Sequence, residues 1–210
     1  MRRECSRLMM IGVLLVCGAC SSSHSPTPAK LYATEYGLGP DKWATAWLLA
    51  GRTDANATLK VLEPNASPGE AVLFDMPEAS IRRIRDRSAF EVALSSLEIS
   101  DPVLVHMARI VHHIEVNFWQ AEGPPEADIV EVAYRGLQQR YGRDRVSADC
   151  YLAFFDRVHS VLVDSQQSGR SFDLDRISLS CEELVQIAHH ADALVPEVPI
   201  ADVISANFRG

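Results

Sequence analysis

His112 and Glu115, three residues apart, are side chains whose types and spacing suit metal binding. On a helix this spacing places two side chains next to each other on one surface. Asp41 and Glu91 complete a carboxylate-rich set with one imidazole if the fold brings their helices near. Such a set suits a divalent ion such as manganese, iron or zinc. The alternatives are a solvated helix surface for the first pair and a buried, hydrogen-bonded role for Glu91.

A second cluster has the opposite charge and consists of four arginines within six residues: Arg82, Arg83, Arg85 and Arg87. Guanidinium groups hold tetrahedral oxyanions well, because their forked donors are fixed and always charged. A helix beginning near Arg87 or Ser88 would add free backbone N–H groups to such a site. Asp86 works against this by pairing with its neighbours. The alternatives are a solvated basic loop and a surface for anionic lipid headgroups.

The first nineteen residues have the pattern of a signal peptide, with a basic start and an apolar run at residues 8–16. That run is too short to span a bilayer as a folded helix. The small residues before Cys20 and the Ser- and Pro-containing stretch after it resemble a bacterial lipoprotein processing site. We therefore expect lipidation at Cys20, a flexible tether over residues 20–34 and, because Ser21 follows, the periplasmic side of the outer membrane. Plain secretion and an uncleaved anchor are the alternatives.

The composition argues against some classes of function. The net charge is −8, and removing the first nineteen residues takes away three Arg and one Glu, which makes the remainder more acidic. An acidic domain is a poor nucleic-acid binder, because phosphate neutralisation needs an extended basic face. The sequence contains no Gly-x-Ser-x-Gly elbow, phosphate loop or dinucleotide fingerprint. These observations favour a binding protein over an enzyme.

Two cysteines remain besides the proposed anchor, Cys150 and Cys181. In an oxidising compartment they can pair and close a loop of about thirty residues, which would stabilise the fold by roughly 3–4 kcal/mol. The alternative is two separate buried thiols. Cys150 follows Asp149 in an apolar stretch without basic neighbours, so we do not expect it to be a reactive thiolate.

The hydrophobic pattern predicts an α+β fold that is predominantly helical, with a short two-stranded α/β opening followed by four or five packed helices. The opening has a helix at residues 40–51 and strands at 57–62 and 71–75. Helices are predicted at 87–97, from Asp101-Pro102 onward, at 126–141 and 146–163, and from Ser180 to about 194. The folded domain is expected at 35–194, with an extended tail at 195–210. Trp43 and Trp47 are expected in the core, and His189 and His190 in structural or surface roles.

Several stretches then occur in one order: DKWATAWLL (41–49), LFDMPEA (73–79), SAFEVAL (88–94), ARIVHHIEV (108–116) and DCYLAFFDRVHSV (149–161). In sequence and spacing they resemble the chromate resistance exported protein family, over roughly residues 35–165. The same domain forms the C-terminal part of a chromate-sensing transcriptional regulator. The resemblance implies a role connected with chromate, and the lipoprotein signal at the N-terminus argues against a transcription factor.

The family commonly carries a His- and acid-containing stretch just before its Phe-Glu pair, and here that stretch is IRRIRDRSA (81–89). The other polar positions of the family pattern match Asp41, Glu91, His112 and Glu115, with Glu115 in place of the more usual Asp. The replacement of histidine and acids by arginines indicates one of two things. Either the ligand has changed from a cation to an anion, or the site has lost its function and become ordinary protein surface.

Our leading hypothesis is a non-enzymatic, lipid-anchored periplasmic protein related to chromate resistance. It would bind chromate, another oxyanion or a divalent metal ion, and contact a membrane through its lipid anchor. The first alternative is a metal-dependent envelope enzyme that uses the carboxylate and histidine set. The second is an envelope interaction module with a degenerate site and an unidentified protein partner.

Overall fold

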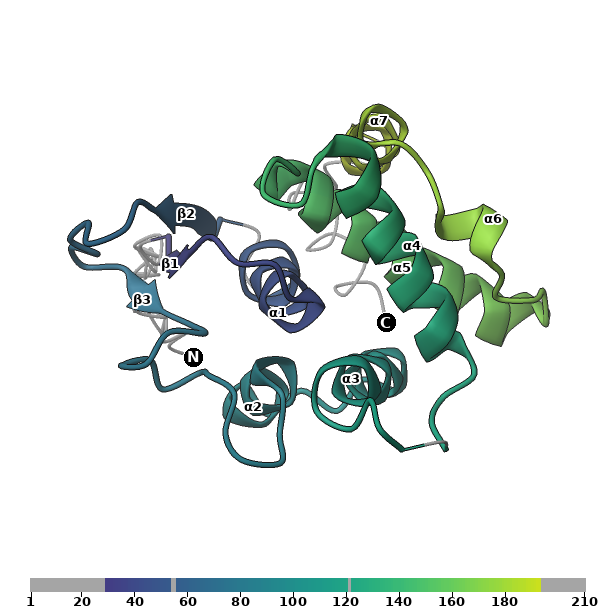
Figure 1. Cartoon of the computed structure of the whole chain (residues 1–210), viewed down its shortest axis with the longest axis horizontal. Coiled ribbons are helices and arrows are strands. Elements are labelled where there is room, and N and C mark those ends of the chain that lie inside the picture. The colour runs from purple at the N-terminus through teal and green to yellow at the C-terminus, as the bar shows by residue number, and fades with distance from the viewer. Residues whose placement is uncertain (1–28, 54–55, 121, 194–210) are drawn as a thin grey trace, which may run out of the picture.

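The computed structural model describes residues 29–53, 56–120 and 122–193. Within them the order is β1 (Leu31–Glu35), α1 (Pro40–Gly51), β2 (Thr58–Leu62), β3 (Val72–Leu73), α2 (Ala89–Ser96), α3 (Pro102–Glu115), α4 (Glu126–Tyr141), α5 (Ala148–Ser168), α6 (Leu174–Ile177) and α7 (Cys181–Ala193). Figure 1 shows the small sheet on one side, α4 to α7 on the other, and α1 between them. The predicted class, α+β and predominantly helical, is confirmed.

The sheet has three parallel strands in the order β2-β1-β3, so the central strand is the first of the strands in the described residues. Leu31 pairs with Thr58 on one side of β1, and Ala33 pairs with Leu73 on the other. The prediction of a two-stranded opening is therefore wrong in its strand count. The predicted tether at 20–34 is also wrong at its end, because residues 31–34 belong to β1. The strand has the sequence LYATE, and its three buried residues are consecutive. It therefore lacks the alternation of polar and apolar residues by which a strand is recognised in a sequence.

Helix α1 runs through the centre of the fold and is buried along most of its length. Trp43 is fully buried and Trp47 is 4% exposed, as expected for core residues. The Trp43 ring stacks on Tyr151 of α5 with centroids 4.8 Å apart, and Tyr134 of α4 stacks on Tyr151 at 5.1 Å. These stacked rings join α1, α5 and α4 into one core.

The remaining helices follow the predicted pattern closely. Helix α4 has the predicted bounds, and α3 begins at Pro102 with Asp101 as its N-cap. Helix α5 continues to Ser168, five residues beyond the predicted end, and the short α6 was not predicted. The predicted capping box before α7 is confirmed, since the Glu183 N–H donates to Ser180 Oγ and the Ser180 N–H donates to Glu183 Oε2. No helix in the described part of the chain is both long and apolar enough to cross a membrane.

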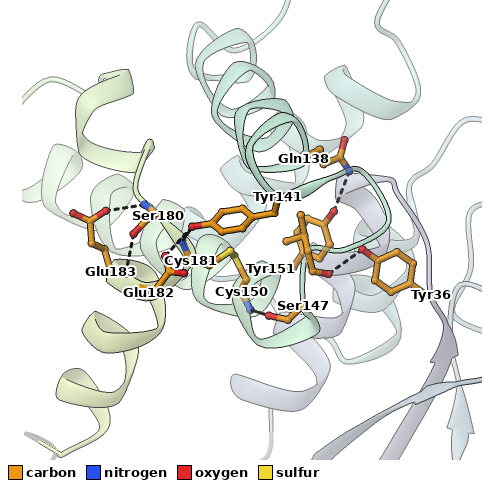
Figure 2. The surroundings of a disulfide bond; sticks show 11 residues. Tyr36, Gln138, Tyr141, Ser147, Cys150, Tyr151, Ser180, Cys181, Glu182 and Glu183 are labelled. Atoms are coloured by element: carbon orange, nitrogen blue, oxygen red, sulfur yellow. Dashed lines mark hydrogen bonds between the residues drawn. A yellow bond between two sulfur atoms is a disulfide. The ribbon is translucent and has the colours of Figure 1, made fainter.

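A disulfide joins Cys150 at the start of α5 to Cys181 at the start of α7, with Cα atoms 5.1 Å apart (Figure 2). The Tyr141 hydroxyl reinforces the junction, because it accepts the Cys181 N–H at 2.9 Å and donates to Glu182 at 2.8 Å. The sequence left open whether these cysteines form a disulfide or two separate buried thiols, and in the structure they form a disulfide. The predicted signal peptide, Cys20 and the predicted tail at 195–210 lie outside the described residues.

Candidate functional site

Asp41, on the first turn of α1, directs its carboxylate at the beginning of α2. The side chain is 5% exposed and accepts the backbone N–H of Ala89 at 2.7 Å and of Phe90 at 2.9 Å. The first N–H groups of a helix have no partner within the helix, and a carboxylate there also complements the helix dipole. The next N–H, that of Glu91, donates to the Ser88 hydroxyl at 3.1 Å. The expectation that free N–H groups of this helix would serve an anion site is therefore wrong, because the protein's own oxygens occupy them.

Burial dominates the electrostatics of Asp41. Removal from water raises the pKa of this carboxyl from 3.8 to about 7, although the two N–H donors act to lower it. The carboxylates of Asp75 and Glu115 add to the increase, because nearby negative charges disfavour ionisation. Asp41 therefore lies in a group of acidic side chains and changes its charge near neutral pH.

Glu91 and His112 form a hydrogen-bonded pair between α2 and α3. Glu91 Oε2 accepts the Ser88 N–H at 2.7 Å and lies 2.8 Å from Nδ1 of His112. The other ring nitrogen, Nε2, lies 2.7 Å from the side-chain amide nitrogen of Asn117. An amide nitrogen can only donate, so we assign the imidazole proton to Nδ1, which then donates to Glu91. A carboxylate orients metal-binding histidines in the same way, but here Asn117 occupies the nitrogen that a metal would need.

Glu115, at the end of α3, faces a different neighbourhood from Glu91. Its Oε2 lies 3.7 Å from Nη1 of Arg83, and its carboxylate packs against Gly39, where a Cβ atom would come within 2.8 Å of Oε1. Burial raises the pKa of this carboxyl, and the guanidinium groups of Arg83 and Arg135 partly counteract that effect. Because Gly39 has no side chain, the Glu115 carboxylate has room beside the start of α1.

The four predicted metal ligands are therefore divided among separate tasks. Asp41 binds the start of α2, Glu91 pairs with His112, and Glu115 pairs with Arg83. Among the residues that the structure describes, no group of three or more His, Cys, Asp or Glu side chains is placed to hold a metal ion.

Three further residues of this region were not identified from the sequence. Lys42 Nζ lies 3.0 Å from Oδ2 of Asp75 and donates to Thr34 Oγ1 at 2.8 Å, which links α1 to the segment after β3 and to β1. The available signals were weak: Lys42 follows Asp41 directly, and Asp75 lies within the LFDMPEA stretch. Pairing of Lys42 with Asp75 neutralises part of the acidic cluster.

The arginine-rich loop is a compact turn before α2. Ile84 and Arg87 exchange two backbone hydrogen bonds, of 3.1 and 2.7 Å, and Arg85 has a φ of 26° at the turn. Arg87 folds back onto α2, where its guanidinium donates to the Glu91 carbonyl at 2.8 Å and to the Ser95 hydroxyl. Arg82 and Arg85 are exposed and form no ion pair with any described residue. Of the four predicted anion ligands, two are thus free and Arg83 has only a long contact.

Two other histidines, His113 and His189, lie outside these contacts. The ring of His113 packs against Gly123, where a Cβ atom would come within 2.3 Å of Nδ1. His189 lines a cavity of about 530 Å³ with Trp47, Asp149 and Asp156, between α1, α5 and α7. The side chain of His190 lies outside the described part of the structure.

Comparison with known proteins gives the family. Residues 32–162 match the family model described as ChrB, C-terminal domain. The chain belongs to this family. It is 32% identical over 122 residues to Protein ChrB of Cupriavidus metallidurans, over 56% of this chain and 36% of that protein. The chain therefore spans about a third of the length of that curated relative. No solved structure matches the chain significantly.

Membership of the ChrB C-terminal domain family confirms the resemblance seen in the five sequence stretches and associates the chain with chromate resistance. The matched segment begins in β1 and ends in α5. It contains Asp41, the arginine-rich loop and the pair of Glu91 and His112. Helices α6 and α7, with Cys181, lie outside the ChrB match, so the disulfide joins the family domain to a segment that follows it.

Proposed function

We propose that this protein is a lipid-anchored component of the cell envelope that supports chromate resistance by binding an oxyanion, without catalysing a reaction. Membership of the ChrB C-terminal domain family supports the link to chromate. The basic and apolar pattern of residues 1–19, followed by Cys20, supports the anchor and the periplasmic location.

The observation that carries the proposal is the state of the arginine-rich loop. Arg82 and Arg85 are exposed and without ionic partners among the described residues, on a turn held by two backbone hydrogen bonds. Guanidinium groups suit a tetrahedral dianion such as chromate. Because the backbone of the turn is already fixed, only the arginine side chains lose conformational freedom on binding. Two nearby carboxylates make hydrogen bonds within the protein, since Asp41 caps α2 and Glu91 binds His112.

Arg83 would be the third ligand of the oxyanion. It is 44% exposed and its Nη1 lies 3.7 Å from the Glu115 carboxylate, a long contact that contributes roughly 1 kcal/mol. A dianion with two further arginines nearby competes effectively for such a group. Arg87 would stay with α2, because its guanidinium is already held by two acceptors.

The test is calorimetric titration of the purified protein with chromate and, separately, with sulfate. We expect the double variant R82A/R85A to bind at least about tenfold more weakly, which corresponds to a loss of about 1.4 kcal/mol. The control is R143A, which removes an exposed arginine in the loop between α4 and α5. No binding by the wild-type protein, or equal binding by R82A/R85A and R143A, would overturn the proposed oxyanion site.

Elemental analysis of the same preparation distinguishes the metal-dependent alternative. Stoichiometric metal that is lost in H112A would contradict the oxyanion proposal and favour an enzyme or metal carrier. The anchor is tested by mass spectrometry of protein extracted from membranes, which should show acyl chains on Cys20. An unmodified Cys20 would overturn the envelope part of the proposal and leave the oxyanion part standing.

A further inference from the structure

Phe118 and Trp119, just after α3, are the most exposed large apolar side chains in the described residues. Phe118 is 69% exposed and Trp119 67%, and their rings meet edge to face with centroids 5.1 Å apart. Single exposed apolar residues are ordinary on protein surfaces. Two adjacent large aromatic rings in water are less common, and such patches mark surfaces for proteins or membranes.

The turn that carries these rings is firmly attached to α3. Val116 is 4% exposed, and its N–H and that of Asn117 both donate to the His112 carbonyl. The Asn117 side chain binds Nε2 of His112 at 2.7 Å, and the Gln120 N–H donates to the Asn117 carbonyl at 2.9 Å. The aromatic rings therefore project from a braced turn, so their exposure is a property of the fold.

Arg83 brings the arginine-rich loop to the same end of α3. Glu115, three residues before Phe118, is the partner of Arg83, so the arginine-rich loop reaches the C-terminal end of this helix. In that loop Arg82 and Arg85 are exposed, and Ile84 is 42% exposed. Trp prefers the boundary between acyl chains and headgroups, and arginines pair with headgroup phosphates. This combination suits a membrane surface better than a purely apolar partner.

We propose that Phe118 and Trp119 insert into the interfacial layer of the same membrane that holds the lipid anchor. The inference rests on the lipidation at Cys20 put forward above. Eight residues separate Cys20 from residue 29, the first one described, and the nine steps between the two Cα atoms span at most about 32 Å. The domain then stays close to the bilayer, and a second contact becomes intramolecular. Insertion of the rings fixes which face of the domain lies against the lipid.

The protein contains its own reporter for this contact. It has three tryptophans, and Trp43 and Trp47 are at most 4% exposed, so Trp119 is the one open to solvent or lipid. The full chain, purified from membranes, is reconstituted into vesicles of phosphatidylethanolamine and phosphatidylglycerol with brominated acyl chains. We expect the bromines to quench Trp119 emission and the vesicles to shield it from aqueous acrylamide. The W119F variant should lose both effects, because its remaining tryptophans are buried.

Matched surface variants separate insertion from a general effect on the fold. F118S should reduce the quenching, whereas V132S, which changes a valine 56% exposed on α4, should leave it unchanged. Trp119 that stays open to acrylamide and unquenched in protein with acyl chains on Cys20 would overturn the inference while leaving the anchor intact. Quenching in protein that mass spectrometry shows to be unacylated would support the aromatic contact and refute the anchor.

Discussion

The carboxylate of Asp41 accepts the backbone N–H of Phe90 at 2.9 Å, although the two residues are 49 positions apart in the chain. This contact makes a side chain of α1 the cap of α2. Burial of this carboxyl, with a smaller contribution from the nearby carboxylates of Asp75 and Glu115, raises its pKa to about 7.

Stability should fall as the pH rises through the range in which Asp41 ionises. The ordinary pKa is 3.8 and the folded one about 7, so between these values the folded state keeps a proton that the unfolded state has lost. Each pH unit in this range then lowers the free energy of unfolding by up to about 1.4 kcal/mol. Urea unfolding at several pH values should show a flatter dependence for D41N than for the wild type.

The slope, rather than absolute stability, is the relevant quantity for this variant. Asparagine also replaces one accepting oxygen with an amide group that cannot accept an N–H, which lowers stability at every pH. The control is D128N, which changes an exposed aspartate on α4 and should keep the wild-type slope. An equal slope in D41N and wild type would show that Asp41 titrates normally.

Removal of the Ser88 hydroxyl should destabilise the fold more than removal of the Ser180 hydroxyl. Both serines form capping boxes, but Ser88 is fully buried and Ser180 is only half-buried. Loss of an N-cap lowers the free energy of unfolding by about 0.5–2 kcal/mol. The loss is at the high end of this range when a buried N–H is left without an acceptor. Chemical denaturation should therefore give a loss near 2 kcal/mol for S88A and a smaller one for S180A. The reverse order would contradict this account of α2.

Loss of the disulfide should lower the free energy of unfolding by roughly 3–4 kcal/mol, because the bond closes a loop of 31 residues. The comparison is between C150A/C181A and the wild type in urea, each with and without reductant. The reductant should bring the wild type close to the double variant and leave the double variant unchanged. Wild-type protein that is fully reduced yet equally stable would show that the bond contributes little.

Neutralising Glu115 should tighten oxyanion binding, because this carboxylate competes with the anion for Arg83. Arg83 is 44% exposed and the contact is 3.7 Å long, so the pair contributes roughly 1 kcal/mol, and E115Q should bind sulfate up to about fivefold more tightly. Burial raises the pKa of Glu115, so wild-type binding should also strengthen as the pH falls and Glu115 takes up a proton.

Sulfate titration of both proteins over a range of pH tests this expectation. E98Q, which changes an exposed glutamate after α2, provides the control for a simple change in net charge. Weaker binding by E115Q would place Glu115 among the groups that support the site instead of competing with the anion.

Local signals explain where the sequence predicted the fold well. Pro124 and Pro125 precede α4 and Gly142 follows it, so its bounds were predicted to the residue. The end of α5 was predicted too early, although Gly169, a left-handed C-cap with φ of 69°, was the available signal. Strand β1 was missed because its pattern is short and its pairing partners lie 27 or more residues further on, as Thr58 does from Leu31.

The site was harder to predict than the fold, because its contacts are between distant segments. The sequence identified Asp41, Glu91, His112 and Glu115 as a set, and the structure brings Glu91 and His112 together. It could not reveal that Asp41 would cap α2, since that depends on how α1 and α2 pack. Nor could the sequence show which arginine would bind α2. The four arginines have the same side chain, and only the fold places Arg87 within hydrogen-bond distance of the Glu91 carbonyl.

The central position of β1 determines how the domain would respond to mechanical load. A pull on the chain before residue 29 enters the fold at the middle strand, which is hydrogen-bonded to β2 on one side and β3 on the other. When such a pull acts along the strand, all of these bonds are sheared together, whereas a terminal edge strand could be peeled away one bond at a time. The end of the chain nearest the proposed anchor is therefore joined to the domain at a point that resists extraction.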